Sequence, residues 1–65
     1  MKLFDTRPEA YAQVQPGEWI MLRETKESTM WATVSPKERM QLGMDWISWE
    51  WIPGTDKSNT AVFGR

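Results

Sequence analysis

Tryptophan is concentrated in this chain to a degree that limits how the chain can fold. Five of the 65 residues are Trp, and three of them lie within residues 45–52. A domain of this length hides only about 60% of the surface that its unfolded chain exposes, so bulky side chains must supply much of its core. One buried Trp removes about 200 Å² from water. The sequence therefore predicts a single compact domain that spans residues 1–65 and is built around tryptophan.

The composition excludes several kinds of site. The chain contains no Cys and no His, which removes disulfides, thiolate metal centres and the commonest metal ligand. Its longest apolar run, residues 19–22, is far too short to cross a membrane. An acid and a proline follow Met1 closely, before the apolar region of a signal peptide could form. We therefore expect a cytoplasmic protein without a metal, a cofactor or a membrane partner.

Two helix starts are recognisable from their capping residues. Thr6 and Ser35 are each followed by a proline in the first turn and by a glutamate three residues later. In this pattern the cap hydroxyl and the glutamate exchange hydrogen bonds with the backbone. The sequence predicts one helix over about 7–14 and another over 36–42, the second ending at Gly43 in the left-handed conformation. Both are so short that packing against a sheet must stabilise them.

Two segments between the helices, residues 18–25 and 29–34, have the alternating pattern of a β-hairpin. In the predicted register three pairs of residues face each other: Leu22 and Trp31, Met21 and Ala32, and Trp19 and Val34. Alternation then divides the side chains between two faces. One face carries Trp19, Met21, Met30, Ala32 and Val34, and the other carries Ile20, Leu22, Glu24, Thr29, Trp31 and Thr33.

Residues 45–52 alternate in the same way and are predicted as a strand, followed by a last strand at about 60–64. Their alternation places Trp49 and Trp51 together on the face that the helices cover. For residues 1–4 two possibilities remain open: a short edge strand, or a segment without regular structure. The resulting α-β-β-α-β-β order predicts an α+β fold, a four-stranded antiparallel sheet with two short helices on one face.

No arrangement of catalytic residues is present. The glycines are isolated and form no phosphate-binding loop, and the acidic residues lack calcium-loop spacing. Without His, a nucleophile would need a lysine or a carboxylate with a raised pKa as its base. Asp45 and Glu50 come nearest to a carboxylate pair, but odd and even strand positions point to opposite faces. We therefore expect a protein that is not an enzyme.

The second face of the sheet is the predicted binding surface. If both helices cover the other face, Trp31 and Trp46 remain exposed together, with Glu24 and Glu50 at their rim. An apolar patch with a polar rim is typical of a protein-binding site. In the alternative arrangement, each helix covers one face and all five Trp rings are core. The sequence leaves both arrangements open.

Such a surface is compatible with three functions. A protein-binding module would use Trp31 and Trp46 as anchors, a small single-stranded nucleic-acid-binding domain would stack bases on them, and a homodimer would bury them against a second copy. A net charge of −1, with acids and bases interspersed, disfavours direct binding of nucleic acid. We therefore expect a protein or a nucleoprotein complex as the partner, bound by a monomer or a homodimer.

In size and composition the chain is similar to the accessory proteins of phages and mobile elements, which are small and lack catalytic groups. Many of these proteins, the anti-CRISPR proteins among them, block a host enzyme or defence complex by stoichiometric binding. The resemblance implies an inhibitor whose acidic residues cover a basic nucleic-acid-binding surface on its target. The acidic candidates are Glu24, Glu27, Asp45, Glu50 and Asp56.

Overall fold

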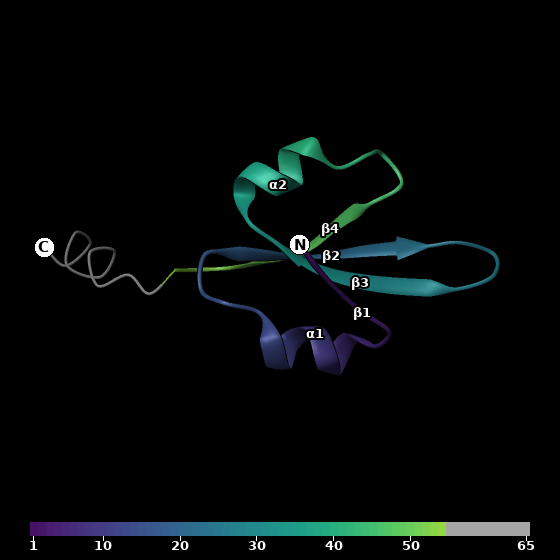
Figure 1. Ribbon diagram of the computed structural model, residues 1–65, viewed down its shortest axis with the longest axis horizontal. Coiled ribbons are helices and arrows are strands. Elements are labelled where there is room, and N and C mark those ends of the chain that lie inside the picture. Colours follow the sequence, from purple (N-terminus) through teal and green to yellow (C-terminus); the bar gives the residue numbers. More distant parts are fainter. Residues whose placement is uncertain (55–65) are drawn as a thin grey trace, which may run out of the picture.

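The computed structural model describes residues 1–54, which form a small α+β domain. Its elements, in chain order, are β1 (Lys2–Phe4), α1 (Arg7–Gln13), β2 (Glu18–Glu24), β3 (Thr29–Val34), α2 (Pro36–Gln41) and β4 (Ile47–Ile52). The four strands form one antiparallel sheet in the order β1-β3-β2-β4 (Figure 1). The predicted fold class is confirmed. The fourth strand of this sheet is the N-terminal β1, whereas the strand predicted at 60–64 lies outside the described residues.

Both helices begin where their capping residues predict. The Oγ1 atom of Thr6 accepts a hydrogen bond from the backbone N–H of Glu9 (3.4 Å), and the Glu9 carboxylate accepts one from the Thr6 N–H (3.2 Å). Ser35 and Glu38 make the same pair of bonds, at 3.1 and 2.8 Å. These bonds satisfy N–H groups that no helical carbonyl can reach. For this reason helices of only seven and six residues begin at defined positions.

The end of α2 differs from the prediction. Leu42 follows the helix with an extended backbone (φ −79°, ψ 153°), and its N–H donates to the carbonyl of Arg39 at 3.2 Å. Gly43 does not have a positive φ, whereas Gly17, in the turn between α1 and β2, does (φ 85°). The predicted left-handed end at Gly43 is therefore wrong, because the extended residue Leu42 has already ended the helix.

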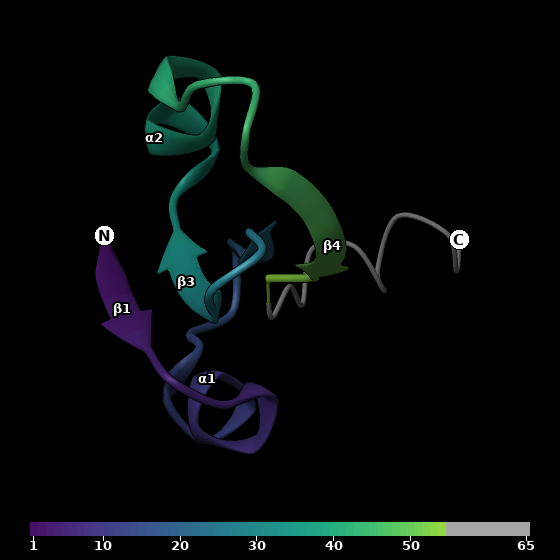
Figure 2. The same ribbon diagram turned by 90° about the vertical axis from the view of Figure 1, so that its right-hand side faces the viewer.

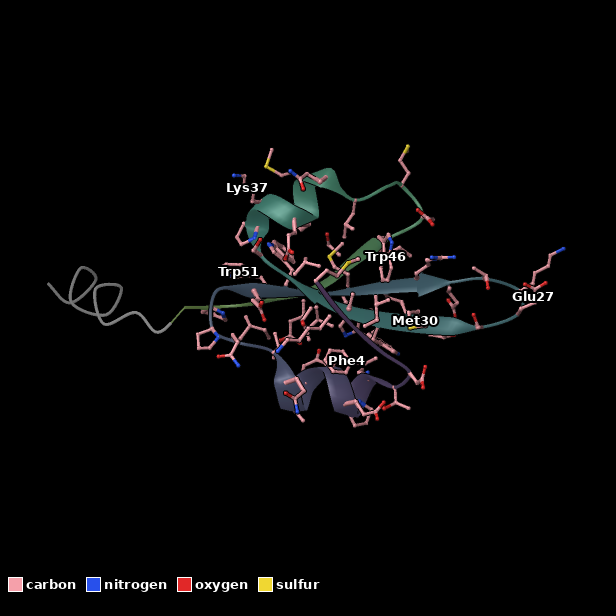
Figure 3. All side chains as sticks on the ribbon, viewed as in Figure 1. Phe4, Glu27, Met30, Lys37, Trp46 and Trp51 are labelled. Carbon is pink, nitrogen blue, oxygen red and sulfur yellow. The ribbon has the colours of Figure 1, made fainter. Side chains whose placement is uncertain are left out.

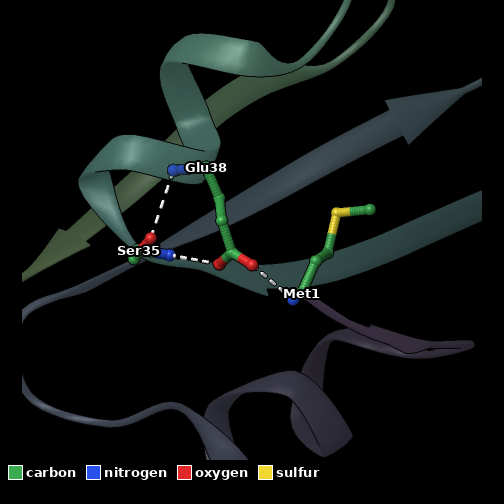
Figure 4. Close-up of polar contacts among 3 residues, drawn as sticks. All are labelled: Met1, Ser35 and Glu38. Carbon is green, nitrogen blue, oxygen red and sulfur yellow. Dashed lines mark hydrogen bonds and ion pairs between the residues drawn. The ribbon is translucent and has the colours of Figure 1, made fainter.

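The Glu38 carboxylate also binds the start of β1 (Figure 4). Its Oε2 atom lies 2.7 Å from the α-ammonium group of Met1, while its Oε1 atom accepts the hydrogen bond from the Ser35 N–H. The bond from the ammonium group, and after it the bond from Ser35, lowers the pKa of Glu38 below its usual range. One side chain thus connects the edge strand β1 to the first turn of α2.

Ser35→Ala is expected to lower the free energy of unfolding by about 1 kcal/mol, because it leaves the Glu38 N–H without its acceptor. Urea denaturation followed by tryptophan fluorescence measures this loss. Lys37→Ala is the control, since Lys37 lies in the same turn, is exposed and takes no part in the capping box. Its effect should stay within about 0.5 kcal/mol. Equal effects of the two substitutions would contradict the capping role of Ser35.

The hairpin of β2 and β3 has the predicted register. Its pairs include Leu22 with Trp31, Met21 with Ala32, and Trp19 with Val34. The turn closes where the Thr25 N–H donates to the Ser28 carbonyl at 2.8 Å and the Thr25 hydroxyl accepts the Ser28 N–H at 3.1 Å. Because the register is as predicted, the division of the hairpin's side chains between two faces is also confirmed.

The sheet is covered on both faces, with α1 on one side and α2 on the other (Figure 2). The α1-side cluster consists of Ala10, Ile20, Leu22 and Trp31, with Phe4, Val14 and Ile52 packed against them. The α2-side cluster consists of Met21, Ala32 and Val34, with Trp19, Leu42 and Trp46 packed against them. The prediction that both helices cover one face is wrong. The alternative of one helix on each face is observed, but its second part, that all five Trp rings are core, is wrong because Trp49 and Trp51 are exposed. Both faces of the hairpin carry bulky apolar residues, so covering only one of them would leave the other in water.

The strand β4 breaks the alternation that its sequence predicts. It begins at Ile47 rather than at residue 45, and it pairs Glu50 with Ile20 but Ser48 with Met21. Trp49 is therefore an extra residue in a β-bulge.

The bulge separates two rings that the sequence placed together. Trp49 lies beside Trp31 of the α1-side cluster, whereas Trp51 pairs with Trp19 on the α2 side. Both Trp49 and Trp51 are exposed. The prediction that they share one buried face is therefore wrong.

Candidate functional site

The two predicted anchors, Trp31 and Trp46, lie on opposite faces of the sheet. Trp31 is 8% exposed and belongs to the cluster beneath α1. Trp46 is half-buried just before β4 and packs on the α2 side (Figure 3). The prediction that the two rings form one exposed patch is wrong, because α1 covers the face on which Trp31 lies.

The predicted acidic residues do not share one rim. Glu24 ends β2, and Glu27 lies in the turn at the far tip of the hairpin (Figure 3). Glu50 lies in β4, opposite Ile20, well away from that tip. Asp56 lies outside the described residues. Glu24 and Glu50 do lie on the same face of the sheet, as predicted, but they are separated along it and Glu27 lies in the turn, so among residues 1–54 the three form no single acidic patch.

Asp45 belongs to a separate arrangement in the turn that precedes β4. One of its carboxylate oxygens lies 3.5 Å from Nε of Arg23, which projects from β2. The Arg23 guanidinium also lies 5.9 Å from the centroid of the Trp46 ring, within range of a cation–π interaction. Both members of the ion pair are exposed, so its contribution to stability is small. Asp45 and Trp46 thus contact the same arginine.

An exposed apolar surface is present, but it lies on β4. Ile47 is 53% exposed, Trp49 44% and Trp51 39%, and the neighbouring Tyr11 of α1 is 37% exposed. We call these four residues the β4 surface. Within residues 1–54, β4 is an edge strand with β2 on its inner side. Sequence reasoning missed this surface because strict alternation buried Trp49 and Trp51, and the sequence contains no signal for the bulge.

On the α1 side, Trp49 is held in place by two neighbours. Its ring meets the Trp31 ring edge to face, with centroids 5.2 Å apart and an interplanar angle of 87°. The Arg7 guanidinium lies 5.9 Å from the Trp49 centroid. The next residue, Glu50, accepts a hydrogen bond from the Tyr11 hydroxyl of α1. The helix thus fixes both a ring and a carboxylate of the edge strand.

The pKa of the Tyr11 hydroxyl is sensitive to its contact with Glu50. Its pKa is raised above the ordinary value of 10.0, first by partial burial and then by the hydrogen bond to Glu50. A raised pKa means that the native state favours the protonated phenol. The stabilisation is therefore complete below the pKa of the unfolded chain and is lost as pH rises through the pKa of the folded protein.

Because Tyr11 is the only tyrosine, absorbance at tyrosinate wavelengths follows it directly. The titration midpoint of the folded protein is expected above 10.0, and that of the urea-unfolded protein near 10.0. Glu50→Gln should lower the folded midpoint without bringing it to the unfolded value, since partial burial remains. A folded midpoint at or below the unfolded one would contradict the Tyr11–Glu50 contact.

On the α2 side, Trp51 is supported by a second ring, Trp19, which itself lies beside an arginine. The Trp51 and Trp19 centroids are 5.3 Å apart, with the planes inclined by 50°. The Arg39 guanidinium of α2 lies 4.4 Å from the Trp19 centroid, and its Nη1 donates to the Ser48 hydroxyl at 3.2 Å. Each face of β4 thus presents one exposed Trp that rests on a second, less exposed Trp.

Residues 1–54 contain no cluster of three metal-ligating side chains and enclose no pocket. None of the helices described is long and apolar enough to cross a membrane.

Comparisons with known proteins give no information on function. No protein-family model matches the chain, and no curated protein or solved structure matches it either.

Proposed function

We propose that this protein is a protein-binding module that acts by stoichiometric binding, without turnover, and that the β4 surface is its anchor. The observation that carries the proposal is a pair of exposed but supported rings on one edge strand. Trp49 rests against Trp31, and Trp51 rests against Trp19. Trp is enriched among the residues that dominate binding energy, and a ring that is already fixed loses little conformational freedom in a complex.

The effect that we propose for this binding is inhibition of a cytoplasmic host protein or nucleoprotein complex, in the manner of phage and mobile-element accessory proteins. Its support is the small size of the chain, its lack of Cys and His, and its balanced charge. Glu50 is the acidic residue best placed to meet a basic partner, since it lies within the β4 edge. Glu24 and Glu27 lie at the hairpin tip, beyond the residues of β2 that pair with β4, and are not part of the proposed site.

A single-stranded nucleic-acid binder is the second candidate, because one exposed ring, Trp49, and the ring that supports the other, Trp19, each have an arginine nearby. Arg7 lies 5.9 Å from the Trp49 centroid, and Arg39 lies 4.4 Å from that of Trp19. Bases stack on Trp, and phosphates bind arginine. However, Arg39 is half-buried and already engages Ser48, and a net charge of −1 gives no general attraction for phosphates. A protein is therefore the preferred partner.

The experiment compares two double variants of the full chain. Trp49→Ala with Trp51→Ala removes the exposed rings of β4. Met40→Ala with Met44→Ala removes two exposed apolar side chains, 81% and 99% exposed, from α2 and the loop after it. Each variant and the wild type is used to capture proteins from a lysate of the source cell. The affinity for the protein that the wild type captures is then measured by calorimetry, and circular dichroism checks that the variants remain folded.

The tryptophan double variant is expected to bind the captured protein at least about 30-fold more weakly, equivalent to about 2 kcal/mol. The methionine variant should bind within about threefold of the wild type. Equal binding by a folded tryptophan variant would refute the β4 surface as the anchor. Tight, salt-dependent binding of an oligo(dT) probe that depends on the same two rings would instead favour the nucleic-acid candidate.

A further inference from the structure

The sheet has two edges, and they differ in how well they are protected. β1 has three residues and carries Lys2, and the ammonium group just before it is bound by Glu38. Short length and lysine are two of the features by which proteins prevent unwanted pairing at a sheet edge. β4 has six residues, with neither Lys nor Pro among them, and its protection is limited to the bulge at Trp49 and the charge of Glu50. Within the described chain, β4 is therefore the edge more open to pairing.

An added strand would meet an aromatic ring on each face of β4. The bulge leaves Trp49 on the α1 side and Trp51 on the α2 side. Successive side chains of a strand point to opposite faces, so an added strand has side chains that reach the ring on each face. A helix laid against the edge would reach the ring of one face only. The distribution of the rings fits an extended partner.

The charge on the α1 side of this edge is negative. Glu50 pairs with Ile20 and Glu18 pairs with Ile52, which places both carboxylates on the same face near the end of β4. Among residues 1–54, neither glutamate forms an ion pair, and Glu50 is exposed. A lysine or arginine on an added strand would complement them.

The same charge disfavours a second copy of the chain as the occupant. If two copies of β4 paired about a central two-fold axis, their Glu50 side chains would lie on one face. Strand spacing and rise place the two residues roughly 5–8 Å apart. Like charges at that separation on one sheet face are destabilising. A different chain with a basic residue avoids this repulsion.

We infer that β4 binds an extended segment of a partner protein as a fifth strand, and that this segment carries a basic residue facing Glu50 between apolar residues that contact Trp49 and Trp51. The inference rests on the proposed function and adds to it the mode of binding and the chemistry of the partner. The backbone of β4 supplies hydrogen bonds, and the rings and Glu50 supply selectivity.

Selection of peptides tests this inference directly. A phage-displayed library of random peptides of about nine residues, long enough to span β4, is selected on the full chain at low salt. Peptides that also bind the Trp49→Ala/Trp51→Ala variant are discarded. The expected survivors are rich in β-branched and aromatic residues and contain a Lys or Arg. A synthetic peptide of this kind should slow hydrogen exchange at least about tenfold for the β4 amides that point away from β2, and leave β1 unchanged.

Substitution of Glu50 tests the charge. Glu50→Gln should weaken binding of the basic peptide about 3- to 10-fold at low salt, and should not affect the same peptide with Gln in place of its basic residue. Glu24→Gln is the matched control, since Glu24 is an exposed glutamate on the same sheet face but at the hairpin tip. It should leave both affinities unchanged.

Several results would overturn the inference: no enriched peptide, enriched peptides without a basic residue, or protection of β1 or a helix instead of β4. Protection of the outward-pointing β4 amides in the free protein would also overturn it, since the edge would already be occupied. Sedimentation would then identify the occupant of the edge: a dimer indicates a second copy of the chain, and a monomer indicates the strand predicted at 60–64. If the tryptophan double variant loses its partner while no peptide protects β4, the protein-binding function stands and strand addition is wrong.

Discussion

Replacing Trp31 by alanine is expected to lower the free energy of unfolding by about 3–5 kcal/mol, which is most of the stability of a small domain. The ring lies on a central strand, is 8% exposed, and packs with Ile20, Leu22 and Ala10. Its removal would leave a cavity under α1 that a seven-residue helix cannot fill. Urea denaturation followed by far-ultraviolet circular dichroism measures the loss.

Trp49→Ala is the matched control, because it removes the same side chain from the ring that touches Trp31. Trp49 is 44% exposed, so we expect a cost of only about 1–2 kcal/mol, from the edge-to-face contact and the neighbouring Arg7. A larger cost for Trp49→Ala than for Trp31→Ala would show that the core and the surface have been assigned to the wrong rings.

Val34→Asp is expected to leave the protein unfolded at neutral pH. Val34 has no exposed surface and packs with Met21 and Ala32 on the α2 side. A carboxylate at that position would lose its hydration without gaining a partner, at a cost of several kcal/mol that a domain of this size cannot absorb. Circular dichroism and near-ultraviolet tryptophan signals should both show loss of structure.

Two controls separate burial from the change of charge. Val34→Thr keeps the shape of the side chain and adds only a hydroxyl, so the expected cost is about 1–3 kcal/mol. Met40→Asp places a new carboxylate at an 81% exposed position of α2 and should change stability by less than about 0.5 kcal/mol. A folded Val34→Asp variant with wild-type spectra would contradict the burial of Val34 in the α2-side cluster.

The parts of the fold that sequence reasoning predicted are those that local interactions decide. Thr6 with Glu9, and Ser35 with Glu38, fix the helix starts through bonds within four residues. The hairpin register follows from a short turn and from two alternating strands. Neither feature depends on what the rest of the chain does.

The parts that sequence reasoning missed depend on how distant elements pack. Which face α2 covers is decided by the path of the chain after β3 and not by the composition of α2. The bulge at Trp49 arises where β4 meets β2, and the period-two pattern of residues 45–52 conceals it. As a result, the candidate anchors are Trp49 and Trp51, whereas the sequence predicted Trp31 and Trp46. Glu50 kept its place among the candidate residues, but beside different rings.

The second helix has a consequence for how the domain opens. α2 has no fully buried residue and is attached through Leu42 just after it, the contacts of Arg39 with Trp19 and Ser48, and the Glu38–Met1 ion pair. Elements with so little buried surface detach in local fluctuations, at a lower free energy than global unfolding. Detachment of α2 would uncover one side of β2 and β3 while the other side stays packed beneath α1. Such an opening can only be transient, because the α2-side cluster that it exposes contributes to the stability of the whole domain, and it makes the α2 side the half that opens first.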